Sequence, residues 1–396
     1  MRHPPRHIFE QTPEALAAWC RERQWPSFRA DQVLDWVFRR GVIDPQAMTN
    51  LSRLERSTLE DNWVFLSGRT LTSRLATDGT RKLLIEWDDA PSPLPAPSAP
   101  TQETPQSRTL PQLAPGAGPS RQTECVMIPA LDPTGARRTA CISSQVGCPV
   151  GCRFCASGLE GLDGNLSAGR IVEQVWRLEQ LIRLEHAQPD LPPPRITNVV
   201  FMGMGEPLSN FNAVTHAVRI LAAPWGMGIS ARKITISTVG LPKYIERLAD
   251  ELDIPVTLAL SLHAPTDEIR RQLIPWAEYT TIADLLAACR RWFEKTGREI
   301  TLEYTLLRGI NDHPDHAARL AALARQIRAN VNLIRYNEVS GLPFRRPQTD
   351  DVREFQRILR ARGINAHIRA SRGRDIAAAC GQLRREHADA SPPSLP

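Results

Sequence analysis

Short apolar runs alternate with longer amphipathic segments over most of the chain beyond residue 138. The apolar runs predict strands at residues 139–143, 196–202, 233–237, 256–261, 300–306, 332–336 and 365–369. Apolar positions with helical spacing predict helices between them, at residues 170–184, 212–222, 242–250, 281–296, 313–327 and 350–362. Such alternation indicates a parallel sheet, open or closed into a barrel. Six or seven units fall short of the eight that make a complete barrel.

The first 88 residues have a different pattern, which predicts a small and mainly helical unit. Thr12 followed by Pro13 predicts a helix start, because a hydroxyl can cap the first turn and proline fits the first helical position. A second helix ends at Gly41, and a third is expected near residues 51–59. Residues 82–87 are typical of a strand and could pair with a strand at 124–129.

Residues 89–122 interrupt this organisation. The segment contains nine prolines, separated mainly by serine, alanine and glutamine, so it offers almost nothing that could pack into a core. We expect a disordered insert there. The chain thus divides into a helical accessory domain at 1–88, the insert at 89–122, a larger α/β domain at 123–388 and a disordered tail at 389–396.

The composition is that of a globular protein with one sizeable domain and an accessory one. The chain has 396 residues, of which 42% are hydrophobic, and no run of 18 apolar residues, so no membrane partner is expected. Its net charge of +6 is compatible with a nucleic-acid partner without requiring one. Residues 1–13 lack the apolar stretch of an export signal, so we expect a cytoplasmic protein whose eight cysteines are thiols or metal ligands.

Three cysteines, Cys148, Cys152 and Cys155, lie in one glycine-containing loop with the spacing C-x3-C-x2-C. A cubane iron–sulfur cluster has four irons and takes thiolate ligands from such loops, so three local cysteines leave one iron open to a substrate or cofactor. Two alternatives stay open on spacing alone. One is a zinc site with Cys141 as its fourth ligand, and the other is a set of thiols that bind nothing.

Polar groups follow four of the predicted strands at their carboxyl ends, where parallel α/β folds carry their working residues. The GMGEP segment at 203–207 follows the second strand, and Ser237 closes the third. The SLH triplet at 261–263 closes the fourth, and Asn337 closes the sixth. Each group alone has an ordinary explanation as a turn, a helix cap or a satisfied histidine. Together with the cysteine loop they predict a site at one rim of the sheet.

These motifs together resemble the radical S-adenosylmethionine (SAM) rRNA methyltransferases of the RlmN/Cfr type. The resemblance rests on the cysteine loop with its SSQVG lead-in at 143–147, the GMGEP segment, the SLH triplet and the ACGQL segment at 379–383. Residues 28–32 and 48–52 are similar to the family's N-terminal helical domain. The likeness covers roughly residues 28–383 apart from the insert, and it is closer to RlmN than to Cfr.

The resemblance implies an α/β fold: a partial (β/α)6-type radical SAM barrel with a small N-terminal helical domain that contacts RNA. It also implies a [4Fe–4S] cluster held by Cys148, Cys152 and Cys155, with SAM at the open iron. The implied SAM-binding residues are Gly205, Glu206, Ser237, Ser261, Leu262, His263 and Asn337.

The reaction implied by the resemblance methylates C2 of an adenosine in 23S rRNA, and also in tRNA, with two SAM molecules per turnover. That carbon has no lone pair with which to attack a methyl sulfonium, so a radical route is required. In the implied scheme Cys380 carries the methyl group, Cys141 attacks the Cys380 sulfur to release the product through a transient disulfide, and Glu124 takes the ring proton. The implied partners are the RNA and an external low-potential electron donor, and the expected state is a monomer.

Three other functions stay open at this stage. Methylation at C8 of the same adenosine, as in Cfr, uses the same motifs. A radical SAM enzyme with a small-molecule substrate would leave the paired Cys141 and Cys380 and the N-terminal unit unexplained. The third is a zinc- or iron-stabilised RNA-binding protein without activity, which iron content and absorbance would distinguish from an iron–sulfur enzyme.

Overall fold

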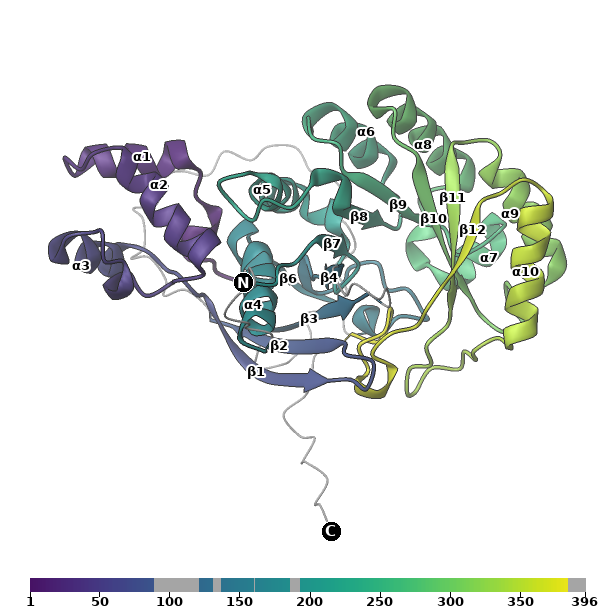
Figure 1. Ribbon diagram of the computed structural model, residues 1–396. Helices are drawn as coiled ribbons and strands as arrows, with labels where there is room; N and C mark the ends of the chain where they lie inside the picture. Colours follow the sequence, from purple (N-terminus) through teal and green to yellow (C-terminus); the bar gives the residue numbers. More distant parts are fainter. Residues whose placement is uncertain (89–120, 131–136, 160, 186–192, 384–396) are drawn as a thin grey trace, which may run out of the picture.

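The computed structural model describes residues 1–88, 121–130, 137–159, 161–185 and 193–383. Its centre is a ten-stranded sheet in the order β1-β2-β3-β4-β7-β8-β9-β10-β11-β12 (Figure 1). The predicted insert at 89–122, apart from its last two residues, and the predicted tail at 389–396 lie outside the described residues.

Seven neighbouring strands of this sheet run parallel, with helices between them. The strands are β4 (Arg138–Cys141), β7 (Asn198–Phe201), β8 (Ile234–Thr238), β9 (Thr257–Ser261), β10 (Ile300–Leu306), β11 (Ala329–Arg335) and β12 (Ala366–Arg369). The helices are α4 (Ala168–Glu185), α5 (Phe211–Ala222), α6 (Pro242–Glu251), α7 (Asp267–Leu273), α8 (Ile282–Thr296), α9 (Pro314–Ala324) and α10 (Thr349–Ala361). Because β1 and β12 form the two edges of the sheet, the barrel is open, and the predicted partial barrel is confirmed.

Three antiparallel strands extend the sheet beyond β4. They are β1 (Gly68–Leu75), β2 (Arg81–Trp87) and β3 (Gln122–Pro129), and the predicted pairing of residues 82–87 with 124–129 is confirmed. The sequence did not predict β1, because most of its residues are polar and partly or fully exposed. Residues 68–87, which the sequence groups with the helical unit, therefore belong structurally to the main sheet.

The N-terminal helices begin and end close to the predicted positions. They are α1 (Pro13–Glu22), α2 (Phe28–Leu34), the π-helical turn η2 (Asp35–Arg40) that continues α2, and α3 (Arg53–Asn62). The Thr12 hydroxyl accepts a hydrogen bond from Ala15 N at 3.2 Å, as a helix cap does. Gly41 ends the second helix in the left-handed conformation (φ +72°).

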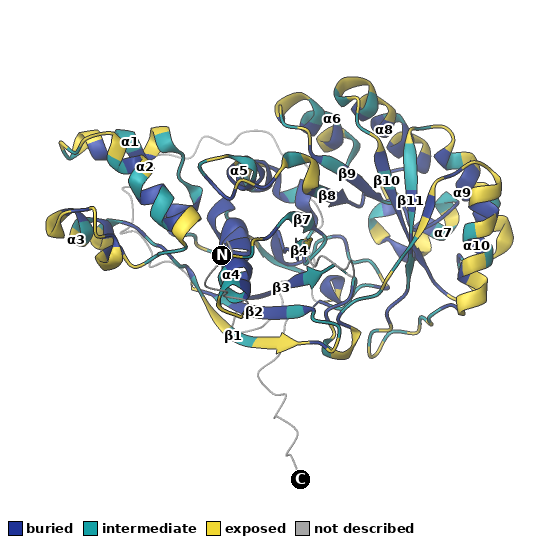
Figure 2. Cartoon of the chain, in the orientation of Figure 1, coloured by how far each residue is buried: buried dark blue, intermediate teal, exposed yellow. Residues whose placement is uncertain are grey.

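The N-terminal unit and the main sheet share one hydrophobic core. Figure 2 shows buried strands inside the molecule and helices whose outer faces are exposed. Phe9 of the N-terminal unit lies 5.7 Å, between ring centroids, from Phe38 at the end of the second helix and from Trp176 on α4. Among the described helices, none is long and apolar enough to span a membrane.

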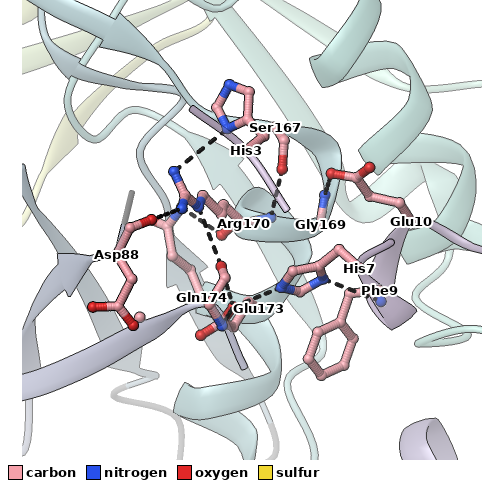
Figure 3. A network of polar contacts seen from close by, with 12 residues as sticks. His3, His7, Phe9, Glu10, Asp88, Ser167, Gly169, Arg170, Glu173 and Gln174 are labelled. Carbon is pink, nitrogen blue, oxygen red and sulfur yellow. Dashed lines mark hydrogen bonds and ion pairs between the residues drawn. The ribbon is translucent and has the colours of Figure 1, made fainter. Parts of the chain in front are cut away.

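A buried carboxylate on α4 also joins the two parts (Figure 3). Glu173 Oε2 lies 3.0 Å from His7 Nε2 and accepts hydrogen bonds from Ser67 N and Oγ, each at 2.9 Å. Glu173 Oε1 accepts from Arg177 Nε at 2.8 Å. Burial alone would raise the pKa of Glu173. The hydrogen bond and charge of His7, the charge of Arg177 and the hydrogen bond from Ser67 N together hold this pKa below its usual range.

Two neighbouring contacts strengthen this junction. Glu10 Oε1 accepts a hydrogen bond from Gly169 N, in the first turn of α4, at 2.9 Å. Arg170 Nε donates to Ser67 Oγ at 3.2 Å, and its Nη2 donates to the Asp88 carbonyl. The start of α4 is therefore fixed to the N-terminal unit and to the end of β2.

Replacing Glu173 with glutamine should destabilise the protein strongly, because His7 and Arg177 would lose the buried charge that they face. Breaking a buried ionic network costs about 3–5 kcal/mol, and we expect a loss of this size in the free energy of unfolding measured with denaturant. Glu185→Gln is the control: it removes a carboxylate near the surface at the end of the same helix, for which less than about 1 kcal/mol is expected. Equal losses in the two variants would contradict the role of Glu173.

Candidate active site

The predicted rim residues lie at the carboxyl ends of the parallel strands. Ser237 and Ser261 close the adjacent strands β8 and β9, with their hydroxyl oxygens 3.4 Å apart. A cavity of about 150 Å³ lies against this rim. The predicted site residues that line it are Cys148, Cys152, Cys155, Gly205, Glu206, Ser237, Ser261, His263, Asn337 and Cys380.

Three other predicted site residues are not part of this cavity wall. The Leu262 side chain is fully buried in the hydrophobic core, and its backbone N–H donates to the Glu303 carbonyl at 3.1 Å. Cys141 ends β4 and lines a second cavity. Glu124 lies on β3, fully buried, and its carboxylate forms an ion pair with Lys82 Nζ.

The cysteine loop follows a short strand that the sequence did not predict. The predicted strand at 139–143 ends at Cys141, because Ser143 N leaves the ladder and donates to Gln174 Oε1 on α4 at 2.9 Å. The chain then forms β5 (Gln145–Gly147), which pairs with β6 (Leu162–Asn165). Cys148 N donates to Gly161 O at 2.9 Å, so the loop is fixed at the end of this small sheet.

The environment of the three cysteines suits a cationic group. Burial raises the pKa of Cys148 to about 12 and that of Cys152 well above the ordinary thiol value, and the neighbouring thiols add to both shifts. The buried Arg270 guanidinium opposes the rise at Cys152. Thiolates crowded in such a partly buried site need a compensating positive charge, which a bound metal cluster supplies. A set of sulfur donors on one short loop therefore fits an iron–sulfur cluster.

The GMGEP segment is packed tightly against the lead-in to the cysteine loop. Gly205 has a φ of +103°, and a Cβ atom there would lie 2.7 Å from both Gln145 Cβ and Ser144 Oγ. Glu206 accepts hydrogen bonds from Leu208 N at 3.0 Å and from Val239 N at 2.8 Å, while burial raises its pKa to about 6. A fixed carboxylate on the cavity wall can bind the ammonium group of an amino acid moiety.

His263 presents a neutral hydrogen-bond donor to the cavity. Its Nδ1 accepts a hydrogen bond from Thr305 N at 3.0 Å, so the ring proton is on Nε2. Burial, with a smaller effect of the Arg270 charge, lowers the pKa of His263 to about 3. The residue has a φ of +56°, and Phe154 packs edge-on against its ring at 5.1 Å between centroids. These contacts fix the direction of the Nε2–H group.

Hydrogen bonds hold the turn that carries Cys380 against the rim and the cysteine loop. Asn337 Nδ2 donates to the Cys380 carbonyl at 3.3 Å. Arg346 Nη1 donates to Asn337 Oδ1 at 3.1 Å, so the guanidinium sets the orientation of the carboxamide. Ala156 N, directly after the last cysteine of the loop, donates to the Gly381 carbonyl at 2.8 Å. Cys380 is thereby positioned beside the cluster-binding loop.

A second cavity of about 630 Å³ shares a wall with the first. The residues that line both are Met202, Glu303, Ile334, Asn337 and Cys380. Cys141 lines only the larger cavity, and burial raises its pKa to about 12, with a further contribution from the neighbouring Cys380 thiol. Cys380 therefore lies at the junction of the two cavities, with a second thiol close by.

Charged residues that the sequence analysis did not identify surround this junction. The partly exposed Arg369 places its Nη1 3.6 Å from Glu303 Oε2, and the same atom donates to Met202 Sδ at 3.4 Å. Lys82 and Glu124 line neither cavity, but Lys82 contacts both Glu124 and the Ala377 carbonyl of the turn that carries Cys380. A charged residue inside an apolar strand, as at Lys82 and Glu303, could have indicated these contacts from the sequence. Such residues are rarely buried without a partner.

Comparison with known proteins defines the class of this site. The model of the Radical SAM superfamily matches residues 142–321, and that of the ribosomal RNA large subunit methyltransferase N-terminal domain matches residues 7–64. The crystal structure of a radical SAM methyltransferase from Sphaerobacter thermophilus is 38% identical, with a TM-score of 0.83, over 96% of this chain and 99% of that chain. Fold and site together are those of a radical SAM enzyme.

Curated relatives show to which family of radical SAM enzymes the chain belongs. A probable dual-specificity RNA methyltransferase RlmN from Rhodopirellula baltica is 38% identical over 97% of this chain and 92% of the relative. The dual-specificity RNA methyltransferase RlmN from Dichelobacter nodosus is 37% identical over 95% of this chain and 93% of the relative. The chain belongs to the RlmN family of radical SAM methyltransferases, whose cofactors are a [4Fe–4S] cluster and SAM. The predictions of enzyme class, fold and cofactors are confirmed, and the zinc and non-enzyme alternatives are set aside.

Replacing Gly205 with alanine should weaken SAM binding at least about tenfold, or more than about 1.4 kcal/mol. The added Cβ would press on Gln145 and Ser144 at a backbone angle that favours glycine. Gly309→Ala is the matched control, with a φ of +73° but nothing within 4 Å of the added atom. It should cost only the conformational penalty of about 1–2 kcal/mol in stability and leave SAM affinity, measured by calorimetry on reconstituted protein, unchanged. Equal SAM affinities in both variants would contradict the close approach at Gly205.

Proposed function

We propose that this enzyme methylates C2 of an adenosine in 23S rRNA and in tRNA, through a methylated Cys380 and with two SAM molecules per turnover. The observation that carries the proposal is the position of Cys380, on the shared wall of the two cavities and beside Cys141. One cavity contains the cluster and SAM residues, and the larger one has room for a base. The names of the RlmN relatives support RNA as the substrate.

Cys148, Cys152 and Cys155 would hold the cluster, and Gly205, Glu206, Ser237, Ser261, His263 and Asn337 would contact SAM. Together the bound cofactors supply the methyl group and a 5′-deoxyadenosyl radical.

The protein's own residues account for the remaining steps. Cys380 links to the base through a methylene bridge between its sulfur and C2. The adduct then gives up one electron, which the oxidised cluster would take back, and the C2 proton, which Glu124 accepts. The Cys141 thiolate then attacks the Cys380 sulfur. The sulfur–methylene bond breaks, its electron pair leaves with the base, and a proton completes the methyl group. The resulting disulfide between Cys141 and Cys380 needs two electrons from an external reductant.

The remaining roles follow from the same proposal. The N-terminal helical unit would contact RNA, because residues 7–64 match an N-terminal domain of ribosomal RNA methyltransferases. An external low-potential donor would reduce the cluster, and the enzyme would act as a monomer.

Nucleoside mass spectrometry tests the substrate and the position of methylation. The anaerobically reconstituted protein is incubated with SAM, a reductant and unmodified 23S rRNA or tRNA, and 2-methyladenosine is expected. Appearance of 8-methyladenosine would replace the proposal with Cfr-type chemistry. Cys380→Ala should assemble the cluster and cleave SAM without methylating RNA, and methyl transfer by this variant would rule out the cysteine relay.

Replacing Cys141 with alanine should trap a covalent complex between Cys380 and the RNA, because no thiolate remains to attack the bridging sulfur. Denaturing gel electrophoresis with labelled RNA would show the complex. Cys289→Ala is the matched control, since Cys289 is a buried thiol on α8 that lines neither cavity. Free methylated product from Cys141→Ala, in the amount that the control yields, would remove Cys141 from the scheme.

A further inference from the structure

Lys82 is a buried cation that faces the predicted proton acceptor. In the pairing of β2 with β3, Lys82 is opposite Val126 and Leu84 is opposite Glu124. Side chains two residues apart on a strand share a face, so Lys82 and Glu124 are diagonal neighbours on one face of the sheet. Lys82 Nζ forms an ion pair with Glu124 Oε1, and the two side chains are only 4% and 0% exposed.

The same ammonium group also contacts the turn that carries Cys380. Lys82 Nζ donates to the Ala377 carbonyl at 3.4 Å, three residues before Cys380. Ala377 has a φ of +51°, a left-handed conformation that is unfavourable for a residue with a Cβ atom. Such a conformation persists only where the surroundings hold it in place. Lys82 is therefore part of what fixes the geometry of this turn.

The tip between β1 and β2 holds the same turn from the outside (Figure 1). Gly373 N donates to Asp78 Oδ2 at 3.0 Å, and Thr77 N donates to Asp375 Oδ2 at 2.9 Å. The antiparallel extension of the sheet thus contacts the Cys380 turn through both its tip and its buried lysine. Glu124 and Cys380, which belong to distant parts of the chain, are linked through one side chain.

Stability alone does not account for a buried ion pair at this position. Removing two charges from water is costly, and an apolar pair of similar volume is often at least as stable. The face that carries Glu124 also carries Val126, which packs with Cys141, Ala378 and Leu383 around the proposed reaction centre. The charged pair lines neither cavity, but it lies on the same strand face as this cluster and contacts the Cys380 turn through the Ala377 carbonyl.

We propose that Lys82 is a positioning residue for this reaction. Its charge favours the ionised carboxylate of Glu124, which can then accept the ring proton. Its contact with the Ala377 carbonyl fixes the position of the Cys380 turn relative to that carboxylate. The inference rests on the proposed function, in which Glu124 takes the proton. Among the described residues, the charged and titratable groups on the elements around Glu124 include Arg81 and Glu86 on β2, Cys125 on β3, Arg138 and Cys141 on β4, Arg177 on α4, Arg369 on β12, and Arg372, Arg374, Asp375 and Cys380 on the turn.

The test compares Lys82→Met, Lys82→Gln and Lys82→Arg with the wild-type enzyme. In the two neutral variants we expect the buried Glu124 to retain its proton to higher pH, because the Lys82 cation that favours the carboxylate is removed. Methylation of Cys380, read by peptide mass spectrometry, should stay intact, whereas release of methylated RNA near pH 7 should slow about 100-fold, as expected for a lost general base. The covalent complex should accumulate, and the pH profile of its release should move upward by at least about one unit. Lys82→Arg, which keeps the charge, should restore most of the wild-type profile.

A second measurement needs neither cofactor nor RNA. Amide hydrogen exchange over residues 373–378 should be faster in Lys82→Met than in the wild type, because the Ala377 carbonyl loses its donor. Arg81→Met is the matched control: Arg81 is the preceding residue on β2 and contacts Glu185 at the end of α4, away from the turn. Exchange in this variant should match the wild type at 373–378.

The outcomes separate the inference from the function on which it rests. A wild-type enzyme that methylates RNA, beside Lys82 variants with unchanged release and an unchanged pH profile, would overturn the role of Lys82 alone. A wild-type enzyme that forms no methylated adenosine would overturn the proposed function and the inference with it. If Lys82→Met does not fold, Lys82→Gln tests the role of the charge instead, since its amide retains a donor for the Ala377 carbonyl while lacking the charge.

Discussion

The active site depends on one contact between two segments that are more than two hundred residues apart in the sequence. Ala156 N and Ser157 Oγ, at the end of the cysteine loop, donate to the carbonyl groups of Gly381 and Leu383 at 2.8 and 2.6 Å. These bonds bring the turn with Cys380 to the edge of the cluster-binding loop. Together with the Asn337 and Lys82 contacts they place Cys380 on the wall shared by the two cavities, where the proposed transfer of a group between them requires it.

The sheet provides the frame for this contact. Its parallel strands end at one rim, so residues from β7, β8, β9 and β11 converge there without long loops. The antiparallel strands β1 to β3 also help to position the Cys380 turn. They carry Glu124 and Lys82, and the tip between β1 and β2 contacts that turn. The same sheet therefore carries both the residues proposed to bind the cofactors and those proposed to act on the substrate.

Much of this arrangement could be predicted from the sequence, because it depends on local signals. The parallel strands are apolar runs, and the residues at their ends are fixed once the strands are assigned. Glu303 and Arg369 were missed because their proximity comes from sheet order, which no local pattern encodes. Lys82 was missed for a similar reason: its contact with Glu124 depends on the register between β2 and β3, which local sequence patterns do not encode. The motif that includes Leu262 could not show that its side chain points into the core.

The buried Glu173 network has a consequence for how the enzyme meets its substrates. The N-terminal helices and the main sheet share one apolar core and one set of buried hydrogen bonds around α4, so moving one part relative to the other would break these contacts. If the helical unit contacts RNA as proposed, these contacts set the distance from that unit to the rim. Two different RNAs that are both substrates would then need the same local shape over that distance.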